Sequence, residues 1–101
     1  MKFNFRGPNN ELLTEVRISP FSKKVTFVNH TDRIMDKAFG KKESVIYDDV
    51  IKFFKLRTVP KSRQSIQDIL KEVGLKEYDP YLLCKKFGGR IAHDDKWIEF
   101  L

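Results

Sequence analysis

Few residues of this chain could carry covalent chemistry. It contains one cysteine, Cys84, and two histidines, His30 and His93. His93 precedes Asp94, a carboxylate that could orient the imidazole as a general base. No serine or threonine stands out as a nucleophile, and Cys84 lies in an apolar run typical of a buried thiol. The sequence therefore predicts a protein that is not an enzyme.

Metal-binding groups are equally sparse. A zinc site needs several cysteine or histidine ligands at short spacing, and here these residues lie far apart. The acidic pairs Asp48–Asp49 and Asp94–Asp95 could hold a hard cation. Carboxylates at a helix start are, however, explained by the helix dipole. We therefore expect neither a metal nor a cofactor.

Basic side chains, by contrast, gather in the middle of the chain. Residues 37–63 carry eight basic and three acidic side chains, and so supply most of the formal net charge of +6. Within residues 52–63 there is no acid, and the cations there are Lys52, Lys55, Arg57, Lys61 and Arg63. Such a cluster beside a helix start can hold phosphates by charge and by backbone donors together. The predicted binding residues for nucleic acid or an acidic partner are Lys52, Lys55, Lys61 and Arg63.

The alternative is that this cluster is only a solvated face. One arginine would then be fixed by backbone carbonyls or by a carboxylate such as Asp94 or Asp95. Arg57 is the best candidate, because a guanidinium makes several hydrogen bonds of fixed geometry and an ammonium does not. Together with Pro60, which separates two helices, and Trp97, in the aromatic C-terminal stretch, Arg57 forms a predicted structural junction.

Three β-strands are predicted in the N-terminal part of the chain, before the basic stretch. Apolar and polar residues alternate over residues 2–6 and 12–19, and residues 25–28 are rich in β-branched and aromatic side chains. Turn-forming residues separate the three segments. We therefore expect an antiparallel meander.

Helices are predicted after the strands. Residues 33–39 have the pattern of a short helix that would end at Gly40. Ser44 is the expected N-cap of the next helix. Pro60 disfavours helical backbone at the residue before it, so this helix should stop near Arg57.

Two further helices are expected beyond the basic stretch. The first begins at the N-cap Ser62, has apolar residues at helical spacing and ends at Gly74. The second begins at Asp79–Pro80, an N-cap followed by proline at the first helical position, and runs to about Phe87. Residues 96–100 form either a strand or a helical turn.

The length and composition set the class of protein. A chain of 101 residues with 41% hydrophobic side chains can bury one core, which predicts a single domain of residues 1–101. The expected fold class is α+β, a small N-terminal antiparallel meander packed against three to four short helices. No apolar run approaches the roughly 20 residues of a membrane span, and no signal peptide is expected. One cysteine fits a reducing compartment, so the expected location is cytoplasmic.

The second half of the chain resembles a known series of motifs. In order these are Phe53-Phe-Lys-Leu-Arg-Thr-Val-Pro-Lys-Ser-Arg-Gln-Ser-Ile66, Ile69-Leu-Lys-Glu-Val-Gly-Leu75, Leu82-Leu83 and Asp94-Asp-Lys-Trp-Ile98. Residues 53–100 thereby resemble an accessory segment of HipA-like proteins of Gram-positive bacteria, in which the segment precedes a kinase domain. The chain contains no such domain, so the resemblance implies a small accessory module, encoded near or on a mobile element, without phosphotransfer activity.

Two functions remain open from the sequence. The first is a non-enzymatic regulatory or inhibitory module that acts on nucleic acid, or on a protein that handles nucleic acid, through residues 52–63. A phage-encoded inhibitor such as an anti-CRISPR protein belongs to this class. The second is an accessory module of a toxin–antitoxin or HipA-like kinase system that binds protein only. Salt dependence separates the two, because counterion release weakens nucleic-acid binding steeply as salt rises.

Overall fold

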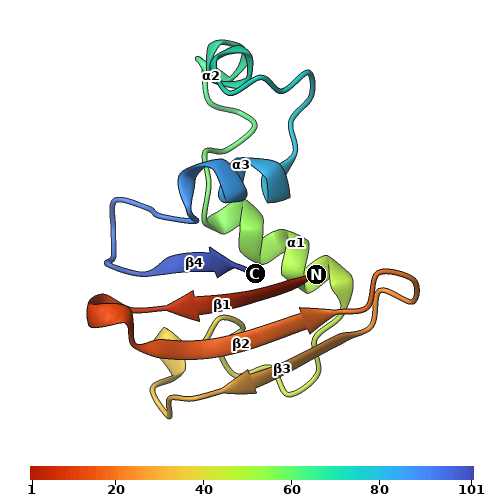
Figure 1. Ribbon diagram of the computed structural model, residues 1–101. Helices are drawn as coiled ribbons and strands as arrows, with labels where there is room; N and C mark the ends of the chain where they lie inside the picture. Colours follow the sequence, from red (N-terminus) through yellow and green to blue (C-terminus); the bar gives the residue numbers. More distant parts are fainter.

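One four-stranded sheet and three α-helices make up the fold (Figure 1). The computed structural model describes residues 1–101. The strands are β1 (Lys2–Arg6), β2 (Leu12–Ile18), β3 (Val25–Asn29) and β4 (Trp97–Phe100). The helices are α1 (Tyr47–Leu56), α2 (Ile66–Glu72) and α3 (Pro80–Phe87), and short 3-10 turns lie at Pro8–Asn10 and Ile34–Asp36. The predicted α+β fold class is confirmed.

The sheet joins the two ends of the chain. Its strand order is β3-β2-β1-β4, and every neighbouring pair is antiparallel. The first three strands form the predicted meander. β4 lies against β1, with Phe3 opposite Phe100 and Phe5 opposite Ile98. Of the two structures expected for residues 96–100, the strand is therefore the one that forms.

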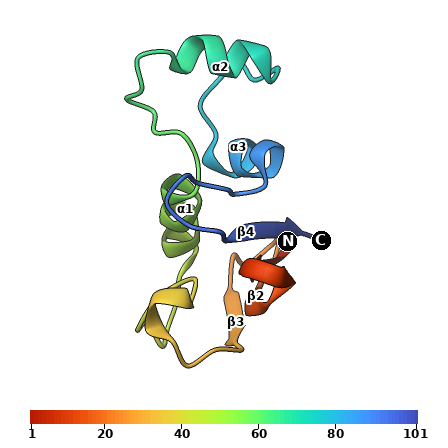
Figure 2. The same ribbon diagram turned by 90° about the vertical axis from the view of Figure 1, so that its left-hand side faces the viewer.

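The main core lies between the sheet and α1. Phe3 and Phe5 project from the same face of β1, because side chains two residues apart on a strand share a face. They meet two buried residues of α1: the ring centroids are 5.2 Å apart for Phe3 and Phe54, and 5.2 Å apart for Phe5 and Phe53. Figure 2 shows α1 along one face of the sheet and no α-helix on the opposite face. This packing holds the end of α1, where the basic stretch begins, against β1.

A second, smaller apolar cluster holds α2. Ile66 and Leu70 of α2 pack with Leu83 of α3. Both ribbon views show α2 beyond α3, farther from the sheet than any other helix (Figures 1 and 2). The basic loop of residues 57–65 connects the end of α1 to α2.

The helix predicted over residues 33–39 does not form. Only the turn Ile34–Asp36 is helical, of the 3-10 type. The backbone groups here bond to side chains of distant segments: the Ala38 N–H donates to Thr14 Oγ1 at 3.1 Å, and the Met35 carbonyl accepts from Lys96 Nζ at 3.1 Å. These tertiary hydrogen bonds replace the local i to i+4 bonds of an α-helix.

Two helices also begin later than predicted. α1 begins at Tyr47, because the Asp49 carboxylate accepts from the Ile46 N–H at 3.0 Å and caps the first turn there instead of at Ser44. The N-cap of α2 is Ser65. Ser62 lies within a turn in which the Arg63 N–H donates to the Pro60 carbonyl at 3.1 Å.

The helix ends follow the prediction. α1 ends at Leu56 and α3 at Phe87. Gly74 and Gly88 take positive φ values of 79° and 71° after α2 and α3, a backbone conformation that favours glycine. Asp79 caps α3 by accepting from the Leu82 N–H at 3.1 Å.

Candidate functional site

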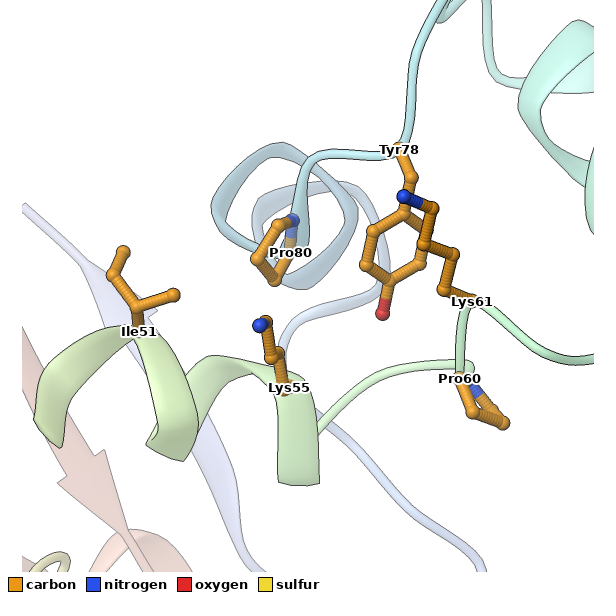
Figure 3. Close-up of a pocket in the computed structure, with 6 residues that line it drawn as sticks. All are labelled: Ile51, Lys55, Pro60, Lys61, Tyr78 and Pro80. Carbon is orange, nitrogen blue, oxygen red and sulfur yellow. The ribbon is translucent and has the colours of Figure 1, made fainter. Parts of the chain in front are cut away.

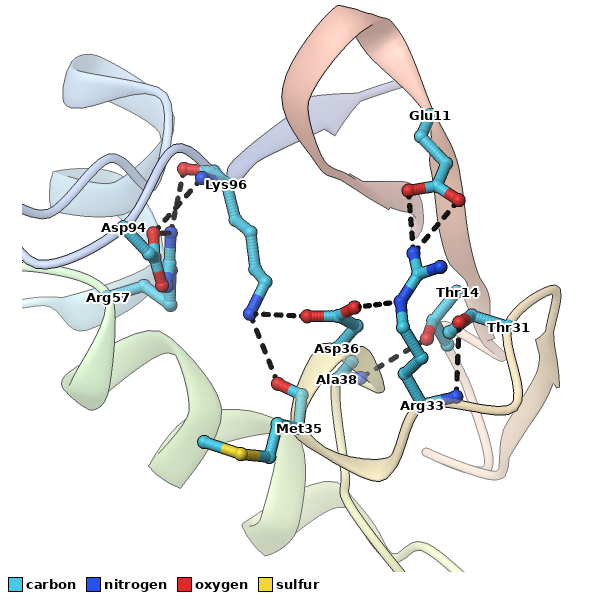
Figure 4. A network of polar contacts seen from close by, with 10 residues as sticks. All are labelled: Glu11, Thr14, Thr31, Arg33, Met35, Asp36, Ala38, Arg57, Asp94 and Lys96. Atoms are coloured by element: carbon cyan, nitrogen blue, oxygen red, sulfur yellow. Dashed lines mark hydrogen bonds and ion pairs between the residues drawn. The ribbon is translucent and has the colours of Figure 1, made fainter.

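Arg57 fixes the start of the basic loop. Its side chain is buried, with only 6% of the residue exposed. Nε donates to the Gly89 carbonyl at 2.9 Å, and Nη1 and Nη2 donate to the two Asp94 oxygens at 2.7 and 3.0 Å (Figure 4). Nη2 also donates to the Lys96 carbonyl at 2.8 Å. Arg57 thus ties the end of α1 to the segment that leads into β4 and is not free for a partner.

A chain of ion pairs continues from this segment to the residue before β2, at the same end of the sheet. Lys96 Nζ lies 3.0 Å from Asp36 Oδ1, and Asp36 in turn pairs with Arg33. Arg33 Nη2 donates to both Glu11 oxygens at 2.8 and 3.0 Å (Figure 4). These contacts connect the residues before β4 to the turn Ile34–Asp36 and to the residue before β2. The stretch from Asp94 onward is therefore part of the fold's framework.

Acid is expected to weaken this framework. Hydrogen bonds from Arg57 hold the pKa of Asp94 below its usual value, and hydrogen bonds from Arg33 do the same for Asp36. A carboxylate with a lower pKa in the folded chain stabilises the fold above its unfolded pKa and loses that contribution as pH falls through the folded pKa. The free energy of unfolding should therefore fall below about pH 4. The variant Asp94→Asn should have a lower free energy of unfolding at neutral pH, and this free energy should depend less on pH.

Urea unfolding followed by circular dichroism between about pH 7 and about pH 2 measures this effect. Asp95→Asn is the matched control, because Asp95 is exposed and forms no ion pair. Equal pH profiles for the two variants would contradict a special role for the Asp94 carboxylate.

The four predicted binding residues are all exposed, and none forms an ion pair. Lys52 and Lys55 lie on α1, three residues apart and so on neighbouring parts of its surface. Lys61 and Arg63 lie in the loop between α1 and α2. Their charges are therefore available to an anionic partner.

A groove beside α1 brings Lys55 and Lys61 together. Its volume is ≈ 510 Å³, and it is lined by Ile51, Lys55, Pro60, Lys61, Tyr78 and Pro80. Figure 3 shows Lys55 rising from α1 and Lys61 from the loop, with the Tyr78 ring between them. The Tyr78 hydroxyl donates to the Val59 carbonyl at 2.7 Å, which holds the ring against the loop. No carboxylate lines this groove.

Arg63 faces a different groove. This groove, of ≈ 410 Å³, also contains Arg90 and His93, and its apolar part includes Leu56 and Ile91. Pro60 lines both grooves, so both adjoin the same loop. The cations that are neighbours in the sequence therefore line two different grooves in the structure. Lys52 lines neither of them.

Arg90 and Lys76 are cations near the loop that sequence reasoning missed. Lys76 lines a third groove together with Lys61, and Arg90 shares the groove of Arg63. The Arg90 guanidinium lies 5.1 Å from the ring centroid of Trp97, the first residue of β4. Neither residue stands out in the sequence, because residues 64–101 carry six basic and seven acidic side chains.

A second basic surface, on the sheet, was also missed. Lys2, Arg17 and Lys24 line a groove of ≈ 420 Å³ that contains no carboxylate. Lys2 lies directly opposite Arg17 in the β1–β2 ladder. Strand alternation places each of these two residues on a solvent-facing position, but only the pairing register brings them together. This surface is a second candidate for binding an anionic partner, and an experiment has to distinguish it from the basic loop.

The groups considered for catalysis are not arranged for it. Cys84 is fully buried, its Sγ lies 3.1 Å from the Phe54 carbonyl oxygen, and burial raises the pKa of its thiol to about 12. Its thiolate is therefore scarcely populated at neutral pH. Both oxygens of Asp94 bond to Arg57 and not to the neighbouring His93. No cluster of three or more His, Cys, Asp or Glu side chains could hold a metal ion, and none of the helices is long and apolar enough to cross a membrane.

Comparisons with protein families, curated proteins and solved structures find no match for this chain. The resemblance of residues 53–100 to HipA-like proteins therefore stays a prediction. The candidate site is a loop anchored by a buried arginine and flanked by exposed cations that form no ion pair.

Proposed function

We propose that the chain is a non-enzymatic regulatory or inhibitory module that binds nucleic acid at its phosphates. Binding uses the basic loop of residues 57–65, here called the Pro60 loop, and the adjoining surface of α1. One observation carries the proposal: of the five cations in an acid-free stretch, Arg57 anchors the loop and the other four are exposed and unpaired. None of the four forms an ion pair with a carboxylate, so each can contribute its charge to the attraction of phosphate.

The arrangement suits contact with the phosphate backbone more than reading of bases. Reading base edges in a duplex requires a helix or a pair of strands that presents several side chains to the major groove. Here the cations are divided between the side of α1 and a loop: Lys55 and Lys61 line one groove, and Arg63 lines another. Contacts of this kind set position and affinity but carry no sequence information. We expect little sequence preference.

Salt dependence tests the proposal. Binding of fluorescently labelled DNA and RNA, each single-stranded and duplex, is followed by anisotropy between about 50 and about 200 mM NaCl. Four phosphate contacts predict a slope of about −3 to −4 for the logarithm of the association constant against the logarithm of salt concentration, a loss on the order of a hundredfold over this range. A flat response, or no binding at low salt, would exclude direct nucleic-acid contact and leave an acidic protein as the partner.

A further inference from the structure

The outer edge of β3 presents unpaired backbone groups. β3 is the last strand of the sheet and pairs only with β2. In this ladder the His30 N–H donates to the Leu13 carbonyl and the Ser19 N–H to the Lys24 carbonyl, so the even-numbered residues of β3 face β2. The N–H and C=O groups of Val25, Phe27 and Asn29 therefore point away from the sheet, and no other segment hydrogen-bonds to them.

The usual protections of an edge strand are missing from β3. Its sequence, Val25-Thr-Phe-Val-Asn29, contains no charge and no proline. Its pairing with β2 runs without a bulge, and Val28 is 55% exposed on the open face. The opposite edge of the sheet differs, since the Ile98 N–H of β4 donates to the Gly88 carbonyl at 2.8 Å. β3 is thus the edge at which another strand can add to the sheet.

We propose that this strand is β3 of a second copy, paired antiparallel about a two-fold axis at Phe27. In this register Phe27 lies opposite its own counterpart, Val25 lies opposite Asn29, and Thr26 lies opposite Val28. The outward backbone groups of both copies then become hydrogen-bonding partners, because directly opposed residues with facing N–H and C=O groups form the hydrogen-bonded pairs of an antiparallel ladder. The two sheets become one continuous sheet.

The two ends of β3 complement each other, which favours a second copy over an unrelated strand. Lys23 and Lys24 precede β3, whereas Asp32 follows it. In this register Lys24 lies opposite His30 of the second copy, and Asp32 is its diagonal neighbour two residues farther along, a favourable pair of opposite charges. An exposed apolar side chain also lies beyond each end of β3. Phe21, 97% exposed, lies on the lysine end, and Met35, 90% exposed, lies beyond the aspartate end. Each is an exposed large apolar side chain that such a dimer brings toward the other.

The dimer should be weak, because a single pair of five-residue strands buries less than the roughly 1,200 Å² of a stable interface. Sedimentation equilibrium of the purified chain should show reversible dimerisation with a Kd above about 1 μM. Amide exchange of Phe27 should slow as the protein concentration rises. A chain that stays monomeric up to about 1 mM, with exchange at Phe27 independent of concentration, would overturn the proposal.

Two double variants separate strand pairing from nonspecific association. Thr26→Lys/Val28→Lys places like charges opposite each other across the axis and should weaken dimerisation by roughly tenfold or more. Thr26→Glu/Val28→Lys places opposite charges there and should preserve it. Within each copy, this control also sets the new carboxylate at position 26 opposite Arg17 and the new ammonium at position 28 opposite Glu15, so the monomer fold is kept. Equal dimerisation of the two variants would contradict the register, and Thr26→Glu/Val28→Glu repeats the test should the lysine pair alter folding.

This inference is independent of the proposed function. The four predicted binding cations lie on α1 and the Pro60 loop, away from β3 in sequence and in the fold (Figure 1). Loss of dimerisation without loss of nucleic-acid binding, or the reverse, shows which of the two proposals has failed.

Discussion

Replacing Arg57 with glutamine is expected to lower the free energy of unfolding by about 3–5 kcal/mol, the usual cost of removing one partner from a buried ion pair. The variant leaves Asp94 without its bidentate partner and removes donors from the carbonyls of Gly89 and Lys96. A domain of this size has about 5–15 kcal/mol of total stability, so the loss takes away a large part of it. Urea unfolding measured by circular dichroism gives the value.

Arg63→Gln is the matched control for this variant. Arg63 lies in the same basic stretch, but it is exposed and forms no ion pair. Its replacement should change the free energy of unfolding by no more than about 0.5 kcal/mol. A cost for Arg57→Gln as small as that of Arg63→Gln would mean that the buried network does not hold the loop.

Gly89→Ala is expected to cost about 2–5 kcal/mol, the second large effect, as the sum of a backbone cost and an overpacking cost. The residue has a φ of +62°, which costs an L-residue other than glycine about 1–2 kcal/mol. A Cβ atom at this position would lie 2.5 Å from Cδ1 and 2.6 Å from Cγ1 of Ile98. Ile98 is buried and its backbone is held in β4, so it cannot move aside freely, and overpacking adds about 1–3 kcal/mol. Urea unfolding again gives the value.

Gly74→Ala separates the two contributions. Gly74 also has a positive φ, +79°, but a Cβ atom there would meet nothing within 4 Å. It should therefore show only the backbone cost of about 1–2 kcal/mol. An equal loss of unfolding free energy in the two alanine variants would mean that the close packing of Ile98 against Gly89 adds no cost of its own.

Local patterns predicted much of the fold. The alternation of residues 2–6 placed β1 because one of its faces is buried. Gly74 and Gly88 predicted the ends of α2 and α3. The residue that follows a helix often has a positive φ, which glycine adopts at little steric cost. Residues 33–39 have a helical pattern but form little helix. Their backbone groups bond to Thr14 and Lys96, residues that come near only after the sheet has formed.

Part of the candidate site can be predicted from neighbouring residues in the sequence, and part depends on contacts between distant segments. The acid-free stretch 52–63 and its exposed cations can be read directly from the sequence. The position of Arg90 beside Arg63 cannot, because it depends on the pairing of β4 with β1 at the far end of the chain. The basic surface formed by Lys2, Arg17 and Lys24 likewise depends on strand register.

We expect nucleic acid to bind at the Pro60 loop, and not merely through the chain's overall charge. Two variants that each lose four exposed cations to glutamine test it in the anisotropy titration. One variant changes the predicted binding residues Lys52, Lys55, Lys61 and Arg63. The other changes residues of the sheet surface and the adjoining turn, Lys2, Arg17, Lys23 and Lys24.

Both variants should keep the circular dichroism spectrum of the native chain, because every replaced side chain is exposed. The loop variant should lose binding and most of its salt dependence, since each lost phosphate contact reduces the slope by about one. The sheet variant should retain most of the affinity. Full binding by the loop variant, or an equal loss in the sheet variant, would contradict the claim.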